Sequence, residues 1–290
     1  MFQNIYQIIK QRKSYRTYSR QIPEASVMEK LKDATEEGMT EQMLQLFPSM
    51  PKLPDIKLIK ITGETVPPST YGVIKGACIY AIMGISGNNS KQLLTASGIL
   101  FERFILRATE LGLATCWLGG TFGKSTFQKA YIKAGGNGNV IIVSPVGYPA
   151  SNMRFSEKLM RTLVKSTSRK DFDALFKFDD SSDIWETDEA KLIKQQIIEI
   201  LEAVRLAPSS RNSQPWRGRV YNDNTLVILD INCINPDGKF ACIDMGIALC
   251  HLFEAATATE LSLTPLNVDY KTLNFRFSVT QRTKPVKKTL

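Results

Sequence analysis

Apolar residues recur at helical spacing in several stretches of the chain. The clearest stretch lies between residues 192 and 204, where the i, i+3, i+4 pattern predicts a helix that Pro208 ends. The same spacing predicts the long helices 97–111 and 244–259 and, nearer the start, short helices that begin at Ile5 and at Pro23.

Strands are predicted where short apolar runs contain β-branched residues. Such runs occupy residues 56–61, 73–85 and 140–143. Further along, residues 219–221 and 226–231 are typical of a hairpin that turns at Asn222–Asn224. The polar stretch between Ala150 and Asp188 has weak periodicity, so we expect it to cross the surface as a connection.

Two distant segments of the chain are similar to each other. GILFERFILRATELGL, residues 98–113, resembles GIALCHLFEAATATELSL, residues 246–263, although the match needs a small insertion. Chance can produce such a match, but duplication of one unit accounts for it better. We therefore expect an α+β fold with a first half at 1–150, a surface connection at 151–188 and a shorter second half at 189–290.

The composition is that of an ordinary globular protein. Of the 290 residues, 43% are hydrophobic and 22% are charged, which excludes a disordered chain, a collagen-like repeat and a long coiled coil. No apolar run approaches the roughly 18–20 residues of a membrane helix, and the first residues lack the pattern of a signal peptide. We expect a soluble, cytoplasmic protein without a membrane partner.

The cysteine and histidine counts exclude several chemistries. Five cysteines without a CxxC pair are expected to be reduced thiols. The single histidine, His251, cannot build a His-rich site, so no metal is expected. A Cys-His mechanism is also disfavoured, because Cys250 and His251 would point about 100° apart on a helix. A packed helical histidine is the favoured interpretation.

A net charge of +9 can indicate an anionic partner. The cations are spread along the chain, and their densest cluster, Arg282–Lys288, is typical of a solvated end. We expect no nucleic-acid partner and retain a basic protein that binds nucleic acid through this tail as one alternative. The glycine-rich run 119–125 is not a phosphate loop, because Leu118 replaces the required first glycine.

Two polar segments that follow apolar helices have the residue types of a ligand site. The first, Arg12–Arg16, gathers three cations and a hydroxyl that can surround a phosphate. The second, APSSRNSQPW at Ala207–Trp216, offers hydroxyls, an amide and prolines in a rigid turn. An ordinary basic turn and an ordinary helix terminator are the alternatives, and spacing alone favours the basic turn for Arg12–Arg16.

Four motifs together resemble the FMN-dependent nitroreductases. APSSRNSQPW is similar to their APSxxNxQPW, and Arg12–Arg16 to their R-R-S-x-R. LRATELGLATCWLGGTF at Leu106–Phe122, followed by Val146–Ala150, is similar to their A-x-x-L-G-L-x-T-C-W-L-G-G … G-Y-P pattern. The resemblance covers nearly the whole chain and is strongest to the branch in which two half-units are fused. It implies a nitroreductase-like three-layer fold, duplicated as a pseudo-dimer in one chain.

The resemblance also implies how many cofactors bind. In simple nitroreductases each chain carries both motifs, and each flavin lies between two chains. Here R-x-S-x-R occurs only in the first half and PSSxN only in the second. One complete site follows, with one FMN per chain in a monomer. A second site would have been lost, in agreement with Leu261-Ser262-Leu263 where the repeat would have Leu-Gly-Leu.

Roles for individual residues follow from the same resemblance. Arg12 and Ser14 would hold the phosphate and ribityl chain, while Arg16 would place positive charge near the flavin N1 and O2. The backbone of Leu118–Gly120 would lie near N5, where glycine allows close approach. The implied cofactor-binding residues are Arg12, Lys13, Ser14, Arg16, Leu118, Gly119, Gly120, Arg169, Lys170, Pro208, Ser209, Ser210 and Asn212.

The activity that the resemblance implies is a ping-pong hydride transfer. NADH or NADPH would reduce the flavin, which would then reduce a small acceptor such as a quinone or a nitroaromatic compound. The protein would supply no catalytic group of its own beyond Arg16, which agrees with a chain that has one histidine. The competing hypothesis is a non-catalytic flavin-binding or regulatory protein.

Overall fold

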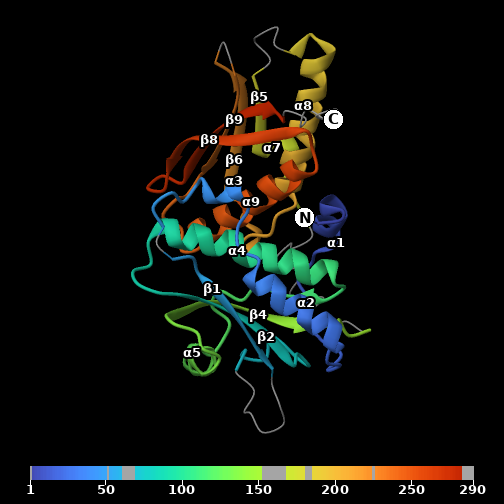
Figure 1. The fold of residues 1–290 in the computed structure, drawn as a ribbon, viewed down its shortest axis with the longest axis vertical. Coiled ribbons are helices and arrows are strands. Elements are labelled where there is room, and N and C mark those ends of the chain that lie inside the picture. The colour runs from blue at the N-terminus through green and yellow to red at the C-terminus, as the bar shows by residue number, and fades with distance from the viewer. Residues whose placement is uncertain are drawn as a thin grey trace, which may run out of the picture.

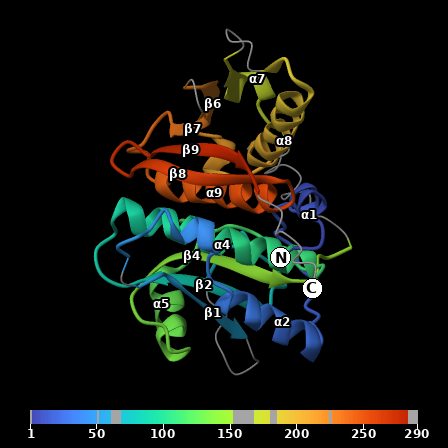
Figure 2. The same cartoon turned by 45° about the horizontal axis from the view of Figure 1, so that its top comes forward.

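The computed structural model describes residues 2–50, 52–60, 69–151, 168–179, 185–223 and 226–282. Two sheets lie on either side of a central pair of long helices, α4 (Lys91–Glu110) and α9 (Ala241–Thr257), as Figures 1 and 2 show. The fold is therefore α+β with three layers, as the resemblance implied.

The two sheets repeat one strand order. The first has the order β1-β2-β4-β3 and consists of β1 (Asp55–Lys60), β2 (Ile79–Ile85), β4 (Asn139–Gly147) and β3 (Ala114–Thr115). The second has the order β5-β6-β7-β9-β8 and consists of β5 (Phe176–Phe178), β6 (Trp216–Asn222), β7 (Val227–Cys233), β9 (Asn274–Gln281) and β8 (Leu261–Asp269). Apart from β5, which pairs in parallel with β6, neighbouring strands are antiparallel. In each half the long helix follows the second strand of the repeat. The chain thus contains one α+β topology twice.

Shorter helices surround this frame. They are α1 (Ile5–Gln11), α2 (Ala25–Glu36), α3 (Glu41–Leu44), α5 (Lys124–Lys133), α7 (Phe172–Leu175) and α8 (Asp188–Arg205). Side-chain caps define several starts, because Ser90 accepts a hydrogen bond from Leu93 N at α4 and Thr187 accepts one from Ala190 N at α8.

The two central helices cross where each similar segment begins. Gly98 of α4 lies against Gly246 of α9, and a Cβ on either glycine would lie 2.9 Å from the Cα of the other. Because helices approach this closely only through small residues, the two glycines set the distance between the halves. Around the crossing, Phe101, Phe104 and Phe253 are fully buried and belong to one core that both halves share.

Three predicted boundaries were wrong. The strand predicted at 73–85 begins only at Ile79, because Gly76 has a positive φ and packs against the backbone of Tyr18 in a turn. The helix predicted at 97–111 begins at Lys91, where the Ser90 cap starts it. The strand predicted at 140–143 extends from Asn139 to Gly147.

Other expectations are confirmed, and one segment is more ordered than expected. The helix at 192–204 lies within α8, and the hairpin at 219–231 is formed by β6 and β7. Within the expected surface connection, α7 and β5 pack with Leu175 and Phe176 buried. Most of the rest of that connection, and the tail from residue 283, lie outside the described residues. In the described part of the chain, no helix could cross a membrane.

Candidate functional site

Arg12 is placed at the junction of the two halves by helix α1. Ile5, Ile8 and Ile9 are buried and hold α1 against α4 and α9, so that Arg12 follows the helix as its C-cap. The Arg12 side chain is 6% exposed. Its Nε lies 3.9 Å from Oε1 of Glu102 and, within the described residues, makes no hydrogen bond. Burial lowers the pKa of this guanidinium from its usual value.

The segment after Arg12 runs beside β3. Tyr15 N donates to the carbonyl of Thr115 at 2.9 Å, and Lys75 N donates to the carbonyl of Arg16 at 2.9 Å. The first bond brings Ser14 next to the strand that leads into Leu118–Gly120, and the second joins Arg16 to Lys75. Lys13, by contrast, is exposed, and its ammonium lies 5.2 Å from the centre of the Tyr15 ring.

The predicted glycine segment faces the second half of the chain. Leu118 is fixed by two backbone hydrogen bonds with Val143, of 2.9 and 3.1 Å. A Cβ on Gly119 would lie 2.8 Å from the ring of Phe240, the residue that precedes α9. Gly120 has open space on its Cβ side. Gly119 therefore lies where the halves meet, as a flavin site between them requires.

The turn that carries Pro208–Asn212 is strained and strongly hydrogen-bonded. Arg211, Asn212 and Gln214 have φ values of 52°, 56° and 48°, a region that costs energy for residues with a Cβ. Ser209 compensates for part of this cost, because its hydroxyl accepts a hydrogen bond of 2.9 Å from Gln214 N. Such clustered strain is a common property of ligand-binding turns.

A carboxylate from α9 holds the same turn. Asp244 Oδ1 accepts a hydrogen bond of 2.9 Å from Ser210 N, and Ser213 Oγ lies 3.5 Å from Oδ2. Burial raises the pKa of Asp244 to about 7, and the two hydrogen bonds oppose this shift. The charge on Asp244, and with it the strength of its bond to Ser210, therefore changes near neutral pH.

Arg169 forms hydrogen bonds with the turn that carries Pro208–Asn212. Its Nη1 donates to Oδ1 of Asn212 at 3.0 Å, and its Nη2 donates to the carbonyl of Leu206 at 3.1 Å. The neighbouring Lys170 donates from its backbone to Oε1 of Gln214 at 2.9 Å. Burial, together with the charges of Arg12 and Arg205, lowers the pKa of Arg169 to about 10.

The hydrogen bond between Arg169 and Asn212, and the effect of the Arg12 charge on Arg169, involve three of the predicted segments. Arg12 comes from the first half, Arg169 from the connection and Asn212 from the second half. Arg12 and Arg169 are largely buried and close enough to repel each other, so an anion between them would relieve both the repulsion and the desolvation. The charges and the buried Arg12 Nε fit a phosphate group such as that of FMN. Among the described residues, no group of three or more His, Cys, Asp and Glu side chains could hold a metal ion.

Several residues at this junction were not among the predicted site residues. Asp244, Gln214 and Trp117 belong to this group, as does Glu102, which is fully buried. The sequence offers one signal for Glu102, which is its position inside the apolar run GILFERF. A charged residue in a buried helix needs a polar partner, so this position indicates a polar contact in the core.

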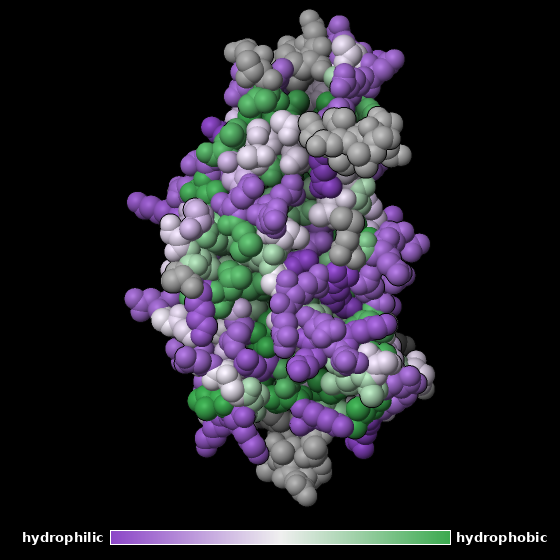
Figure 3. All heavy atoms as spheres, in the orientation of Figure 1, coloured by the Kyte–Doolittle hydropathy of each residue, from purple (hydrophilic) through white to green (hydrophobic). Residues whose placement is uncertain are grey.

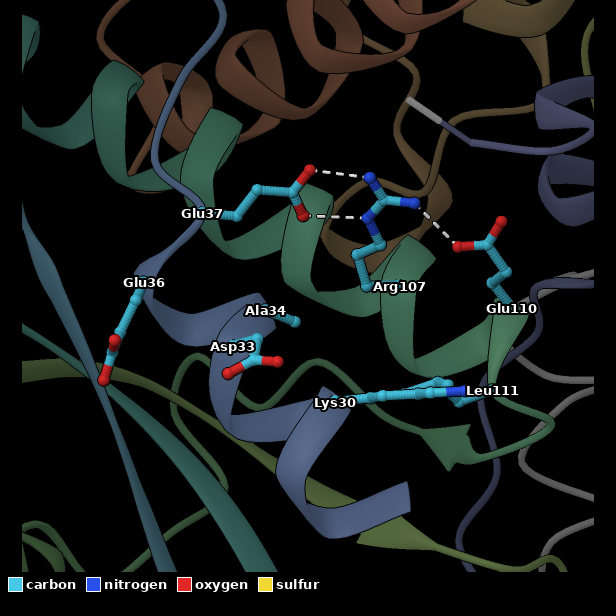
Figure 4. A pocket seen from close by; sticks show the side chains of 8 residues that line it. All are labelled: Lys30, Asp33, Ala34, Glu36, Glu37, Arg107, Glu110 and Leu111. Carbon is cyan, nitrogen blue, oxygen red and sulfur yellow. Dashed lines mark hydrogen bonds and ion pairs between the residues drawn. The ribbon is translucent and has the colours of Figure 1, made fainter. Parts of the chain in front are cut away.

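One hollow lies away from this junction, between α2 and α4 (Figure 4). It has a volume of about 480 Å³, and its walls carry the ion pairs of Arg107 with Glu37, 2.6 Å, and with Glu110, 2.7 Å. Hydrophilic side chains dominate this part of the face in Figure 3. None of the predicted site residues lines it, so we assign this hollow no part in the site.

Known proteins share the family and the fold of this chain. The sequence profile of the family described as "Putative TM nitroreductase" matches residues 4–256. A nitroreductase structure from Thermotoga maritima has a similar fold, with 19% identity, 96% of this chain and 94% of that chain covered, and a TM-score of 0.57.

A smaller match is an FMN-bound nitroreductase from Bacteroides fragilis, with 17% identity, 52% of this chain and 91% of that chain covered, and a TM-score of 0.40. No curated protein matches the chain in sequence. Because the family profile covers most of its length, the chain belongs to this nitroreductase family and is an oxidoreductase.

Proposed function

We propose that this protein is an FMN-dependent NAD(P)H oxidoreductase that binds one FMN per chain at the junction of its halves. The observation that carries the proposal is the hydrogen bond from Arg169 to Asn212, together with the charge of Arg12, which lowers the pKa of Arg169; the three residues come from three different segments of the chain. In this proposal a single chain, without a second copy, supplies the whole site, and its halves span 1–150 and 189–290.

Different residues would bind different parts of the cofactor. Arg12 and Arg169 would neutralise the phosphate, because burial lowers the pKa of both guanidinium groups and a phosphate would stabilise their charged forms. Ser14 and Arg16 would approach from the first half, with Arg16 near the flavin N1 and O2. The backbone of Leu118–Gly120 would face the N5 edge. On the other side, Pro208, Ser209, Ser210 and Asn212, with Lys170, would complete the site.

When bound, FMN supplies hydride transfer from NADH or NADPH to a small acceptor such as a quinone or a nitroaromatic compound, in two successive half-reactions. The chain itself orients the bound groups and places positive charge beside them. It contributes no histidine to the reaction, because its one histidine, His251, is fully buried and contacts the carbonyl of Ala203 and the carboxylate of Glu102. We propose further that no metal and no nucleic acid takes part and that the protein is cytoplasmic.

The absorption spectrum of the purified protein tests the proposal, followed by anaerobic addition of NADH and NADPH. Colourless samples are first incubated with free FMN. A yellow protein that either nucleotide bleaches, and that a quinone or nitroaromatic compound reoxidises, is the expected result. A yellow protein that resists bleaching would favour a non-catalytic flavin-binding protein. A protein that binds no FMN would overturn the proposal.

A further inference from the structure

Glu102 is a charged side chain at the centre of the core, with both carboxylate oxygens in use. Its Oε2 accepts a hydrogen bond of 2.7 Å from Trp117 Nε1. Its Oε1 lies 3.0 Å from His251 Nε2 and 3.9 Å from Arg12 Nε. Neither Glu102 nor His251 is exposed to solvent. A buried carboxylate is costly unless its partners are well placed, so the position of each partner is tightly constrained.

The three partners of Glu102 lead to three parts of the proposed flavin site. Arg12 is itself a proposed phosphate ligand. Trp117 directly precedes Leu118–Gly120. His251 Nδ1 lies 2.9 Å from the carbonyl of Ala203 in α8, the helix that leads into the turn at Pro208. Glu102 thus contacts side chains up to 149 residues away from it in sequence.

The His251 ring has a fixed orientation in this network. A backbone carbonyl can only accept, so Nδ1 must donate its proton to Ala203. The contact between Nε2 and Glu102 Oε1 then contains a second proton, whether ring or carboxyl carries it. The ring therefore bridges α8 and α4 through two hydrogen bonds, and the bridge crosses the boundary between the halves.

We propose that Glu102 is a positioning residue of the flavin site. It keeps Arg12, the Trp117–Gly120 segment and, through His251, the Pro208–Asn212 turn in the relative positions that bind FMN. This inference rests on the proposed function, because it concerns the same site. Glu102 does not itself touch the cofactor in this account.

The sign of one affinity change separates positioning from a purely electrostatic effect. Removing a carboxylate near Arg12 makes the surroundings more positive, which by itself would tighten the binding of a phosphate. Loss of positioning weakens binding instead, because Arg12 and Trp117 must then be ordered when FMN binds. For Glu102→Gln, whose amide oxygen can serve Trp117 but whose NH2 group repels Arg12, we expect FMN affinity to fall about tenfold.

The experiment is an FMN titration of the wild-type protein, Glu102→Gln and Glu254→Gln, with flavin fluorescence quenching as the readout and thermal unfolding measured in parallel. Glu254 is the matched control, because it is 2% exposed and forms an ion pair with Arg103 across the same pair of helices. Both variants should lose stability. Only Glu102→Gln should lose affinity.

If the wild-type protein binds FMN and Glu102→Gln binds equally well or more tightly, the positioning role is overturned. Equal weakening in both variants would also overturn it, as a general effect of core damage. Should Glu102→Gln fail to fold, Trp117→Phe is the second test, since it removes the hydrogen bond to Oε2, keeps an aromatic ring beside Phe101 and should weaken FMN binding about threefold. Unchanged affinity in that variant would overturn the inference. A wild-type protein that binds no FMN would overturn the proposed function as well.

Discussion

At the scale of single residues, the site consists of charges that folding has removed from water. Arg12 and Arg169 are cations near each other, and burial lowers the pKa of both. Asp244 is a buried carboxyl group under the neighbouring turn, and burial raises its pKa to about 7. Burial raises the free energy of the charged form of such a group, and a ligand of opposite charge lowers it again.

Arg169 allows a direct test of the phosphate site. Arg169→Met keeps most of the aliphatic volume and removes the charge, so it should cost about 1.5–3 kcal/mol, or about tenfold to a hundredfold, in FMN affinity. FMN titration followed by fluorescence measures this loss. Arg219→Met is the matched control, because the Arg219 side chain is 63% exposed on β6. Equal affinities for both variants would exclude Arg169 from the site.

The raised pKa of Asp244 predicts how the free energy of unfolding depends on pH. Its pKa rises from 3.8 to about 7 on folding, so the native state holds a proton that the unfolded state has released. The free energy of unfolding should therefore fall as pH rises from about 4 to about 7, by up to about 4 kcal/mol. Urea unfolding at several pH values should show a shallower dependence for Asp244→Asn. The fully exposed Asp188→Asn should follow the wild-type curve, and an unchanged slope in Asp244→Asn would contradict the account.

The motif residues were visible in the sequence, while the residues that support them were not. Arg12 and Asn212 could be named because they lie in short segments with an unusual density of polar groups. The role of Glu102 and His251 depends on a contact between residues 149 positions apart, and no local sequence pattern predicts such a contact. Asp244 could be predicted as part of a helix, but its hydrogen bond to Ser210 depends on how α9 lies under the turn.

At the scale of elements, α4 and α9 determine how the halves fit together. They cross at Gly98 and Gly246, and the polar contacts of Glu102 with His251 and of Arg103 with Glu254 lie along the same pair of helices. Since Arg12, Trp117 and the turn after α8 are attached to this pair, the site depends on its geometry.

A methyl group at the crossing should separate the two helices. In Gly98→Ala the new Cβ would meet the backbone of Ile243, which cannot move aside as a side chain can. We expect a loss of at least about 2 kcal/mol in the free energy of unfolding, measured in urea without FMN. Gly120→Ala, which adds its methyl group to open space, should change stability by less than about 0.5 kcal/mol. Similar losses in the two variants would contradict close packing at Gly98.

The elements differ in how well their sequence predicts them. Helix α8 has an uninterrupted apolar face and the hairpin of β6 and β7 has a polar turn, so both were recognised. Strand β3 has two residues and is too short for any periodicity. Strand β8 contains Pro265 and a shift of register next to it, which hides its alternation. Helix α5 was missed because its start lies in the glycine-rich run after Gly119.

At the scale of the whole molecule, one chain has the architecture of two units. The strand orders β1-β2-β4-β3 and β6-β7-β9-β8 match, and the two long helices pack in the same place in each half. The resemblance to nitroreductases, first indicated by four motifs, is confirmed by a family match over residues 4–256. Because the cationic motif lies in one half and the polar turn in the other, the repeat predicts one site rather than two.

Native mass spectrometry of the protein after incubation with excess FMN tests this central claim most directly, because it counts chains and cofactors together. We predict one dominant species, a single chain of 32.5 kDa with one FMN. A chain with two FMN molecules, or FMN bound only to a dimer, would contradict the single site within one chain.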